Sequence, residues 1–308
     1  MDINYKQKYL KYKYKYLQLQ KGGEQNTVES VVVTHNGRIR CFLESIKMPA
    51  IDKNTGKEIR FMNCCILLLS ITKNGYTLSL EYEGNLAEES VKKAKKEGRK
   101  YYSTKNNDDI FVQFTKQVSL DTSLFQDIGD KTCNFYIIRH ADGLHNSMGL
   151  IKKSYSSDVT DAVLSTEGIK QAEEAKNFLK AFQIDQLYVS DLKRTRQTLA
   201  ILIQNRDEIK ATEVVVLPCA HELNYVKGGL CDADQKMSAL SYENKPKCST
   251  DKSKCDEACC TVNNLPINWS FYRAFYGDGT RIAHGQNAKR CRDTNMIQQA
   301  FEHMKSRQ

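Results

Sequence analysis

Two adjacent side chains, Arg139 and His140, form a pair that could act on a phosphate ester. They follow the apolar run NFYII (134–138), which predicts a buried strand, so both lie at that strand's carboxyl end. Ligands of α/β sheets bind at this edge. A guanidinium is a planar fork for phosphate oxygens, and a neutral imidazole is a nucleophile near pH 7. The pair therefore predicts phosphoryl chemistry.

Three further stretches extend this pattern. They are LSTEGIKQA (164–172), SDLKRTRQT (190–198) and HELNYVKGG (221–229). Together with RHADGLHN (139–146), they resemble motifs of the histidine phosphatase superfamily, which includes the cofactor-dependent phosphoglycerate mutases. The family patterns are RHGxxxxN, LTxxGxxQA, SxLxRAxQT and the acidic residue of an ExxxG-like loop, in this order. Ala141 stands where the family usually has glycine, and Thr195 where it has alanine.

The resemblance implies a phosphomonoester hydrolase of the histidine acid phosphatase type. His140 would attack phosphorus and become phosphohistidine, while Arg139 and Arg194 hold the equatorial oxygens. Glu222 would protonate the leaving group and then activate water, and Asn146 would orient the phosphoryl group. The family needs no metal or other cofactor, and it acts on small phosphorylated substrates. Two alternatives remain: a phosphomutase on the same site, or a catalytically silent binding or virion protein.

The family also requires a second histidine, at the tip of a VVVSHG-like strand that follows the closing helix. Here the closing helix is predicted over 293–306, where the sequence stops. The stretch VVVTHNG instead places His35 after a β-branched strand near the beginning. We therefore expect a circular permutation, with His35 binding the phosphoryl group. His284, in GTRIAHGQN, and a site without a second histidine are the alternatives.

The elements that must position these groups alternate between strand and helix. This predicts an α/β fold with a mostly parallel central sheet and helices on both faces, phosphoglycerate mutase-like. Strands are expected at 61–71, 76–82, 134–138, 186–189 and 213–217, and helices at 166–182 and 194–204. The Asn74–Gly75 pair predicts a hairpin turn.

The permutation sets the expected domain boundaries. Residues 28–84 and 131–308 form a single permuted domain, with 85–130 as a linker between the original termini. The irregular, cysteine-rich segment 226–280 is expected to be an inserted cap. Within it, the spacing of four cysteines matches no common zinc site, so zinc, disulfides and neither remain open. These are Cys248, Cys255, Cys259 and Cys260.

The other histidines and the late aromatic residues receive less specific predictions. His145 and His221 flank the motifs and are expected to be pocket-wall or packing residues. His303 is expected at the surface of the closing helix. Trp269, Tyr272 and their aromatic neighbours are expected to pack the closing region.

Composition limits the class of protein. The 308 residues are 40% hydrophobic and 27% charged, which predicts a packed core. The net charge of +9 favours acidic partners, without choosing among phosphate esters, nucleic acid and anionic lipid. No specific nucleic acid partner is predicted. There is no apolar run of membrane-spanning length and no signal-peptide h-region, so a cytoplasmic location is expected.

The first 23 residues form a basic Tyr/Lys-rich tract that ends in Gly22–Gly23. We expect a tail outside the core, either simply solvated or docking on an anionic surface or partner. The tract resembles the N-terminal leaders of giant DNA virus proteins. That resemblance implies a viral protein in the host cytoplasm or the virion.

Overall fold

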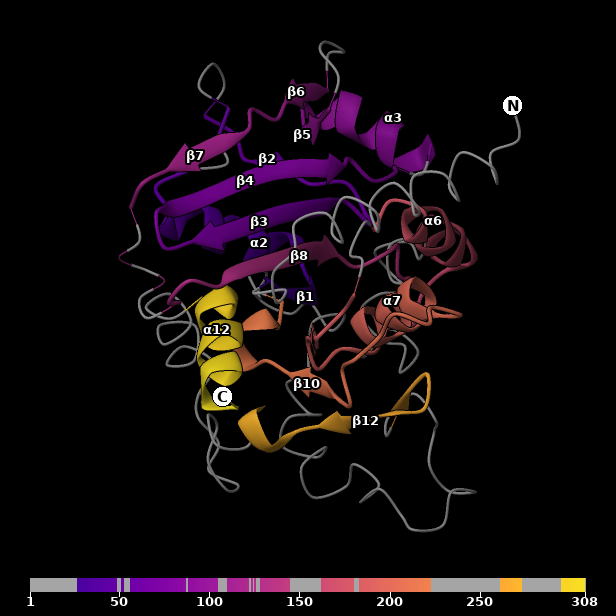
Figure 1. Ribbon diagram of the computed structural model, residues 1–308. Helices are drawn as coiled ribbons and strands as arrows, with labels where there is room; N and C mark the ends of the chain where they lie inside the picture. The colour runs from indigo at the N-terminus through magenta and orange to yellow at the C-terminus, as the bar shows by residue number, and fades with distance from the viewer. Residues whose placement is uncertain are drawn as a thin grey trace, which may run out of the picture.

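A nine-stranded sheet crosses the part of the chain that the computed structural model describes (Figure 1). This part comprises residues 27–48, 51–52, 56–86, 88–104, 110–121, 123, 125, 128–144, 162–179, 183–222, 261–272 and 295–307. The strands of the sheet are β1 (Thr27–Thr34), β3 (Ile66–Thr72), β4 (Gly75–Tyr82), β7 (Gln117–Ser119), β8 (Thr132–Arg139), β9 (Gln186–Val189), β10 (Val214–Val216), β11 (Thr261–Val262) and β12 (Leu265–Asn268).

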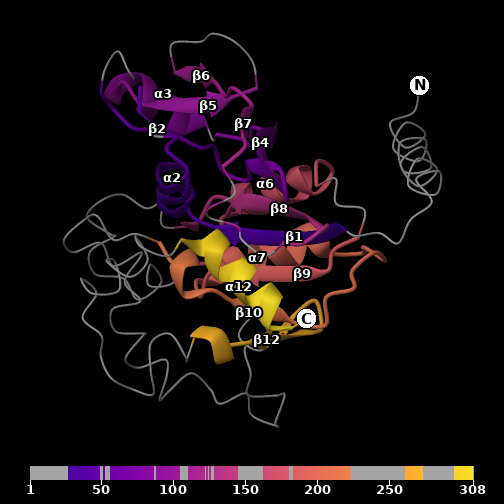
Figure 2. The same cartoon turned by 60° about the vertical axis from the view of Figure 1, so that its left-hand side comes forward.

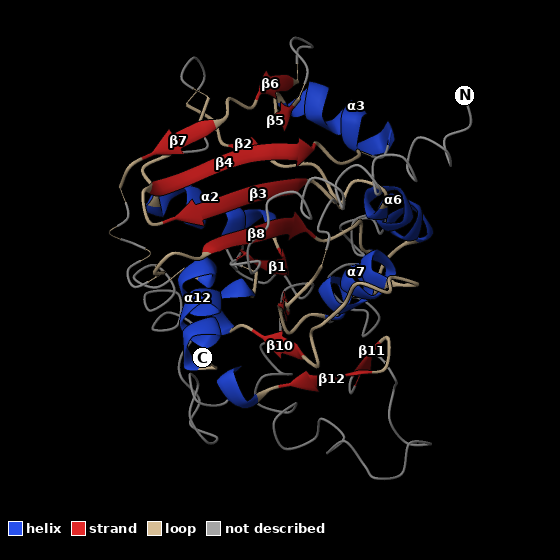
Figure 3. Ribbon diagram, in the orientation of Figure 1, coloured by secondary structure: helices blue, strands red, loops and turns tan. Residues whose placement is uncertain are grey.

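The strand order is β11-β12-β10-β9-β1-β8-β3-β4-β7, which Figure 3 shows from β12 at the bottom to β7 at the top. The α/β class is confirmed, but the expectation of a mostly parallel sheet is wrong because the sheet is mixed. The pairs from β12 through β10, β9 and β1 to β8 are parallel. The pairs β8–β3, β3–β4, β4–β7 and β11–β12 are antiparallel.

The first strand, β1, lies inside the sheet between β8 and β9. Its residues Val31, Val32 and Val33 are fully buried, as expected for a strand covered on both faces. Val31 is level with Tyr136 of β8 and with Leu187 of β9. The carboxyl ends of three strands, those that precede His35, His140 and Ser190, therefore meet at one edge.

Helices cover both faces, as predicted (Figure 2). One apolar cluster joins α2 (Asn36–Ser45) and α12 (Met296–Ser306) to Val32, Phe135 and their neighbours on one face. A second cluster joins α6 (Thr166–Lys176) and α7 (Lys193–Ile203) to Val31, Ile138 and their neighbours on the other. Alternate residues of β1 thus anchor opposite layers, because successive side chains of a strand point to opposite faces.

The antiparallel half of the sheet results from a hairpin. Gly75 has a φ of 136° at the turn between β3 and β4, and a short turn of this kind can join only antiparallel strands. A Cβ on Gly75 would lie 2.0 Å from the carbonyl oxygen of Ser119, so β7 closes over the turn. Strand direction therefore reverses between β3 and β4, and β3 also runs antiparallel to β8.

Residues 85–130 are more than a connection. They contain α3 (Glu88–Glu97), β5 (Lys100–Ser103) and β6 (Phe111–Gln113), and β5 pairs with both β6 and the short β2 (Ile59–Arg60). A small apolar cluster around Met62, Ala94, Tyr101 and Ile110 lies beneath α3. This small unit stands beyond β4 in Figure 1.

The described part of the expected cap belongs to the sheet. Within 226–280, strands β11 and β12 form a hairpin, and β12 extends the sheet beside β10. The rest of that segment, including its four clustered cysteines, lies outside the described residues, as does the tract 1–23. None of the helices that the structure describes has the length and apolar character needed to span a membrane.

Candidate active site

His140 sits immediately after β8 and is 3% exposed. Its backbone N–H donates to the carbonyl of Thr34, which ties the ends of β8 and β1 together. Its Nδ1 lies 2.6 Å from the carbonyl oxygen of Ala141. A carbonyl oxygen can only accept, so Nδ1 carries the proton and Nε2 keeps its lone pair. The fold thus presents His140 as a nucleophile through Nε2.

Arg194 bridges the two imidazoles. This guanidinium is 1% exposed in the first turn of α7. Its Nε donates to His140 Nε2 at 3.3 Å, and its Nη2 lies 3.4 Å from His35 Nδ1. The two rings lie 4.8 Å apart between centroids. Three groups that are far apart in the sequence therefore converge on one point.

His35 is fully buried and is the N-cap residue of α2. Since a guanidinium only donates, His35 Nδ1 accepts from Arg194, and its Nε2–H donates to Ser190 Oγ at 2.9 Å. Burial and, secondarily, the charge of Arg194 hold the pKa of His35 well below its usual range. His35 is therefore neutral near pH 7 before a ligand arrives.

Glu222 completes the inner group. Its Oε2 lies 3.5 Å from His35 Nδ1. Glu222 follows the short 3-10 helix η2 (Pro218–Ala220), which is held to the β1 end by a 2.8 Å hydrogen bond from Thr34 Oγ1 to the carbonyl of Ala220. The carboxylate thus faces the imidazoles across a short gap, where a proton could be exchanged.

A buried network that the sequence did not reveal supports His35. Ser190, which accepts from His35, donates to Asp191 Oδ1 at 3.3 Å. The same oxygen lies 2.7 Å from His221 Nδ1, and Tyr272 donates to Asp191 Oδ2 at 3.0 Å. His221 and Tyr272 were expected to be packing residues, and no spacing signal marked Asp191. The available clue to Asp191 was that an acidic residue occupies the second position of the SDLKRTRQT stretch.

The local field favours an anion over a metal ion. Ligand atoms of His35, His140 and Glu222 all lie within 4.8 Å of one another, which alone would suit a cation. However, Arg194 touches both imidazoles, and a fixed guanidinium repels a metal ion. The amino ends of α2 and α7 also begin here, and helix amino termini attract negative charge. The group is thus suited to phosphate.

Comparisons with known proteins agree with this geometry. Residues 135–230 match the family model of the histidine phosphatase superfamily, branch 1. This segment of the chain is therefore similar to histidine phosphatases. A protein named probable fructose-2,6-bisphosphatase TIGAR A, from Danio rerio, is 29% identical over 89 residues. That alignment spans 29% of this chain and 33% of the relative. No solved structure matches significantly.

The family match begins within β8 and therefore covers His140, Arg194 and Glu222 but not β1. His35 reaches the histidine phosphatase site from outside the matched segment. The structure brings together His35, His140, Arg194 and Glu222 among the residues predicted for the site. Asn146 and the alternative second histidine, His284, lie outside the described residues, as does His145.

Arg139 differs from the expectation that it joins this group. Its Nη1 donates to the carbonyl of Phe61, just after β2, and its buried Nε has no hydrogen-bond partner among the described residues. The Phe61 N–H in turn donates to Asn36 Oδ1 at 2.8 Å, next to His35. Arg139 and Asn36, which are the sequence neighbours of the two histidines, thus both form hydrogen bonds with the backbone of Phe61. Arg139 stands at the rim, between the site and the small unit.

Several residues of the segments that resemble the family motifs form hydrogen bonds with the backbone. Thr198 Oγ1 accepts from the Ala141 N–H at 3.1 Å, directly behind the nucleophile. Gln171 accepts from the Asp142 N–H at 3.0 Å, and Gln197 from the Leu164 N–H at 2.8 Å. A Cβ on Gly168 would lie 2.0 Å from the Asp142 carbonyl, which explains the glycine. These residues fix the loop after His140.

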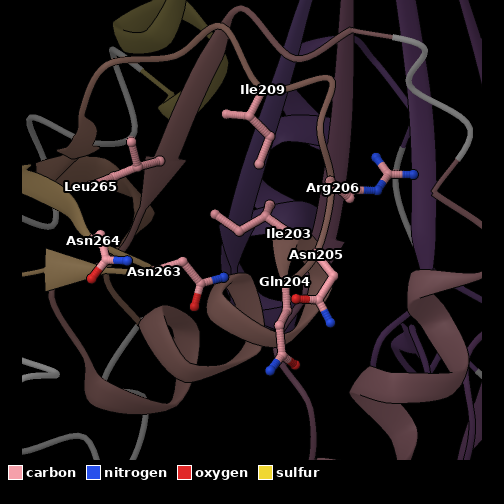
Figure 4. Close-up of a pocket in the computed structure, with 8 residues that line it drawn as sticks. All are labelled: Ile203, Gln204, Asn205, Arg206, Ile209, Asn263, Asn264 and Leu265. Carbon is pink, nitrogen blue, oxygen red and sulfur yellow. The ribbon is translucent and has the colours of Figure 1, made fainter.

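A separate hollow of about 380 Å³ lies at the other end of α7 from Arg194 (Figure 4). Amide side chains and three aliphatic residues line it, and it contains none of the residues predicted for phosphoryl chemistry. It is therefore not the catalytic site. The lining residues are Ile203, Gln204, Asn205, Arg206, Ile209, Asn263, Asn264 and Leu265.

Proposed function

We propose that this protein is a phosphomonoester hydrolase that works through a phosphohistidine on His140. One observation carries the proposal: His140 Nε2 is held as an unprotonated nitrogen by the Nδ1–Ala141 hydrogen bond and faces Arg194. The family match supports phosphatase or mutase chemistry in general. The hydrolytic route, the acid phosphatase type and the residue roles are part of the proposal.

In the first step, His140 Nε2 attacks phosphorus and the P–O ester bond breaks. Arg194 shifts its two donated hydrogen bonds from the imidazoles to equatorial oxygens, and the neutral His35 accepts a proton or a hydrogen bond there. Such preorganised charge is the main requirement of phosphoryl transfer. Glu222 gives its proton to the departing alkoxide, so the first product leaves as an alcohol.

In the second step, Glu222 takes a proton from water as the hydroxide attacks the phosphohistidine. The P–N bond breaks, inorganic phosphate leaves, and Glu222 and His140 return to their starting protonation states. In both in-line steps the leaving or attacking oxygen lies opposite His140 Nε2, and we propose that Glu222, 3.5 Å from His35 Nδ1, acts on that oxygen. Residues of this chain supply each charge that the cycle needs, so we propose that it runs without a metal ion.

We also propose that residues 27–84 and 131–307 form one circularly permuted histidine phosphatase domain. Two features support this reading. β1 lies in register between β8 and β9. The end of α12 approaches the start of β1, since Met304 Sδ is 4.0 Å from Cys133 Sγ and Cys133 is level with Val28. A chain continuing from α12 could therefore enter β1 directly.

The proposal is tested by trapping the intermediate. The wild type is mixed with a ³²P-labelled phosphomonoester and quenched in alkali, which preserves phosphohistidine, and the modified peptide is identified by mass spectrometry. We expect label on His140. Turnover of a small phosphate ester without label on any histidine would contradict the mechanism, and absence of both turnover and label would favour the silent binding protein.

A further inference from the structure

Asp191 is a buried carboxylate that lies two residues beyond the end of β9 and is 4% exposed. Its Oδ1 accepts from Ser190 Oγ at 3.3 Å and lies 2.7 Å from His221 Nδ1. Its Oδ2 accepts from the Tyr272 hydroxyl at 3.0 Å. Burying a charge is costly unless hydrogen bonds compensate, and here three side chains supply them. Because Ser190 also contacts His35, Asp191 is connected to the candidate active site.

The hydroxyl of Ser190 links Asp191 to His35, and its hydrogen bonds can be assigned one by one. A hydroxyl has one proton to donate and two lone pairs that accept. One lone pair accepts from the Leu192 N–H at 3.1 Å. The proton goes to Asp191 Oδ1, because a carboxylate oxygen only accepts. The second lone pair is left for His35 Nε2, 2.9 Å away, so Nε2 must carry a proton.

The proton on Nε2 decides what the other ring nitrogen of His35 can do. In a neutral imidazole it leaves a lone pair on Nδ1. This lone pair accepts from Arg194 Nη2 at 3.4 Å, while Arg194 Nε donates to His140 Nε2 at 3.3 Å. In the opposite tautomer, an Nδ1–H would face a guanidinium N–H, and two donors cannot form a hydrogen bond. Arg194 would then lose one of the two contacts that hold it between the imidazoles.

We propose that Asp191 is a positioning residue that acts through Ser190 to hold His35 in the Nε2–H tautomer. The tautomer in turn keeps Arg194 aimed at the position of the phosphoryl group. In Ser-His-Asp hydrolases a buried carboxylate fixes the tautomer of an imidazole by direct contact. Here a serine hydroxyl stands between the carboxylate and the imidazole. The kinetic consequence rests on the proposed function, whereas the tautomer of the resting protein does not.

The tautomer is read by NMR of ¹⁵N-histidine-labelled protein at neutral pH, with the His35 signals assigned as those missing in His35→Gln. We expect a protonated Nε2 in the wild type. Asp191→Leu removes the accepting oxygens without adding a donor, so the Ser190 proton should turn to Nε2 and the ring proton should move to Nδ1. Ser190→Ala should give the same change, because Glu222 Oε2, 3.5 Å from Nδ1, can then accept in place of the lost hydroxyl. Asp185→Leu is the matched control, since it removes a carboxylate from the other end of β9 and should leave the tautomer unchanged.

Turnover of a small phosphate ester gives a second readout. Asp191→Leu and Ser190→Ala should each lower kcat/KM roughly 10- to 100-fold, less than the loss of a direct contact to the developing charge. The double variant should lose no more than about threefold beyond either single variant, because both changes break one chain of hydrogen bonds. An unchanged tautomer in both variants, or losses that multiply in the double variant, would overturn the proposal. Failure of the hydrolase proposal would appear separately, as wild-type protein that has the expected tautomer but forms no phosphohistidine.

Discussion

Two regions of the chain contribute side chains to the candidate active site, yet they differ in how clearly the sequence marks them. The segment from β8 to Glu222 carries motif after motif and matches the family model. The segment around β1 contributes an imidazole that is equally buried and equally close to Arg194, but it lies outside that match. The loop that fixes a nucleophilic histidine involves many residues, so it produces a long sequence motif. A histidine that only accepts a hydrogen bond needs a strand that ends at the right place, so its sequence motif is short.

The first way to test this comparison is to remove the nucleophile. His140→Ala should lower kcat/KM for a small phosphate ester by roughly 10⁴-fold or more, because it removes the proposed nucleophile. The melting temperature should change little. His303→Ala, which removes an imidazole from the remote α12, is the control and should keep near-normal activity. Comparable losses in both variants would mean that His140 acts through folding alone.

The second test removes the histidine from the unmatched region. His35→Ala should lower kcat/KM by roughly 10² to 10³, as for the loss of one stabilising contact to the developing charge. Phosphohistidine should still form on His140, but slowly. If His35→Ala keeps full activity, the two regions do not share one site and the permuted reading loses its main support.

The third and smallest expected effect concerns pH. The folded protein keeps His35 neutral because burial lowers its pKa, whereas the unfolded chain takes up a proton near the ordinary value of 6.5. Stability is therefore lost as pH falls below about 6.5, at up to about 1.4 kcal/mol per pH unit. The free energy of unfolding should fall less steeply in His35→Gln than in the wild type between pH 7 and 5. Parallel curves would show that His35 is protonated when folded.

Much of the site could be predicted because it depends on local patterns. A run of three valines predicts a strand that is buried on both faces, and the polar residue at its end must then emerge at the sheet edge. That argument placed His35 beside His140 before any contact was known. The contact of Arg139 Nη1 with the Phe61 carbonyl was not predicted, because only the three-dimensional path of β2 brings that carbonyl near. The role of Arg139 in holding the phosphoryl group stays a prediction.

Other features depend on contacts that no local pattern records. Asp191 has three partners, Ser190, His221 and Tyr272, and two of them are more than 29 residues away. His303 was expected at the surface and is buried, because Tyr188 and Phe271 cover the side of α12 on which it lies. The sheet was expected to be mostly parallel because strands and helices alternate along much of the sequence, but the β3–β4 hairpin adds antiparallel strands beside β8.

The central position of β1 has a consequence for the protein's synthesis. Glu29 of β1 binds Asn134 across 105 residues, His35 binds Ser190 across 155, and Thr34 binds Ala220 across 186. During translation this valine-rich strand is made before β8 and β9, the strands that pair with its two edges. Pairing between segments far apart in the sequence forms slowly, and until it forms the unpaired strand edges are prone to aggregation. The two edges of β1 therefore cannot both be paired until the chain has been made through residue 189, the end of β9.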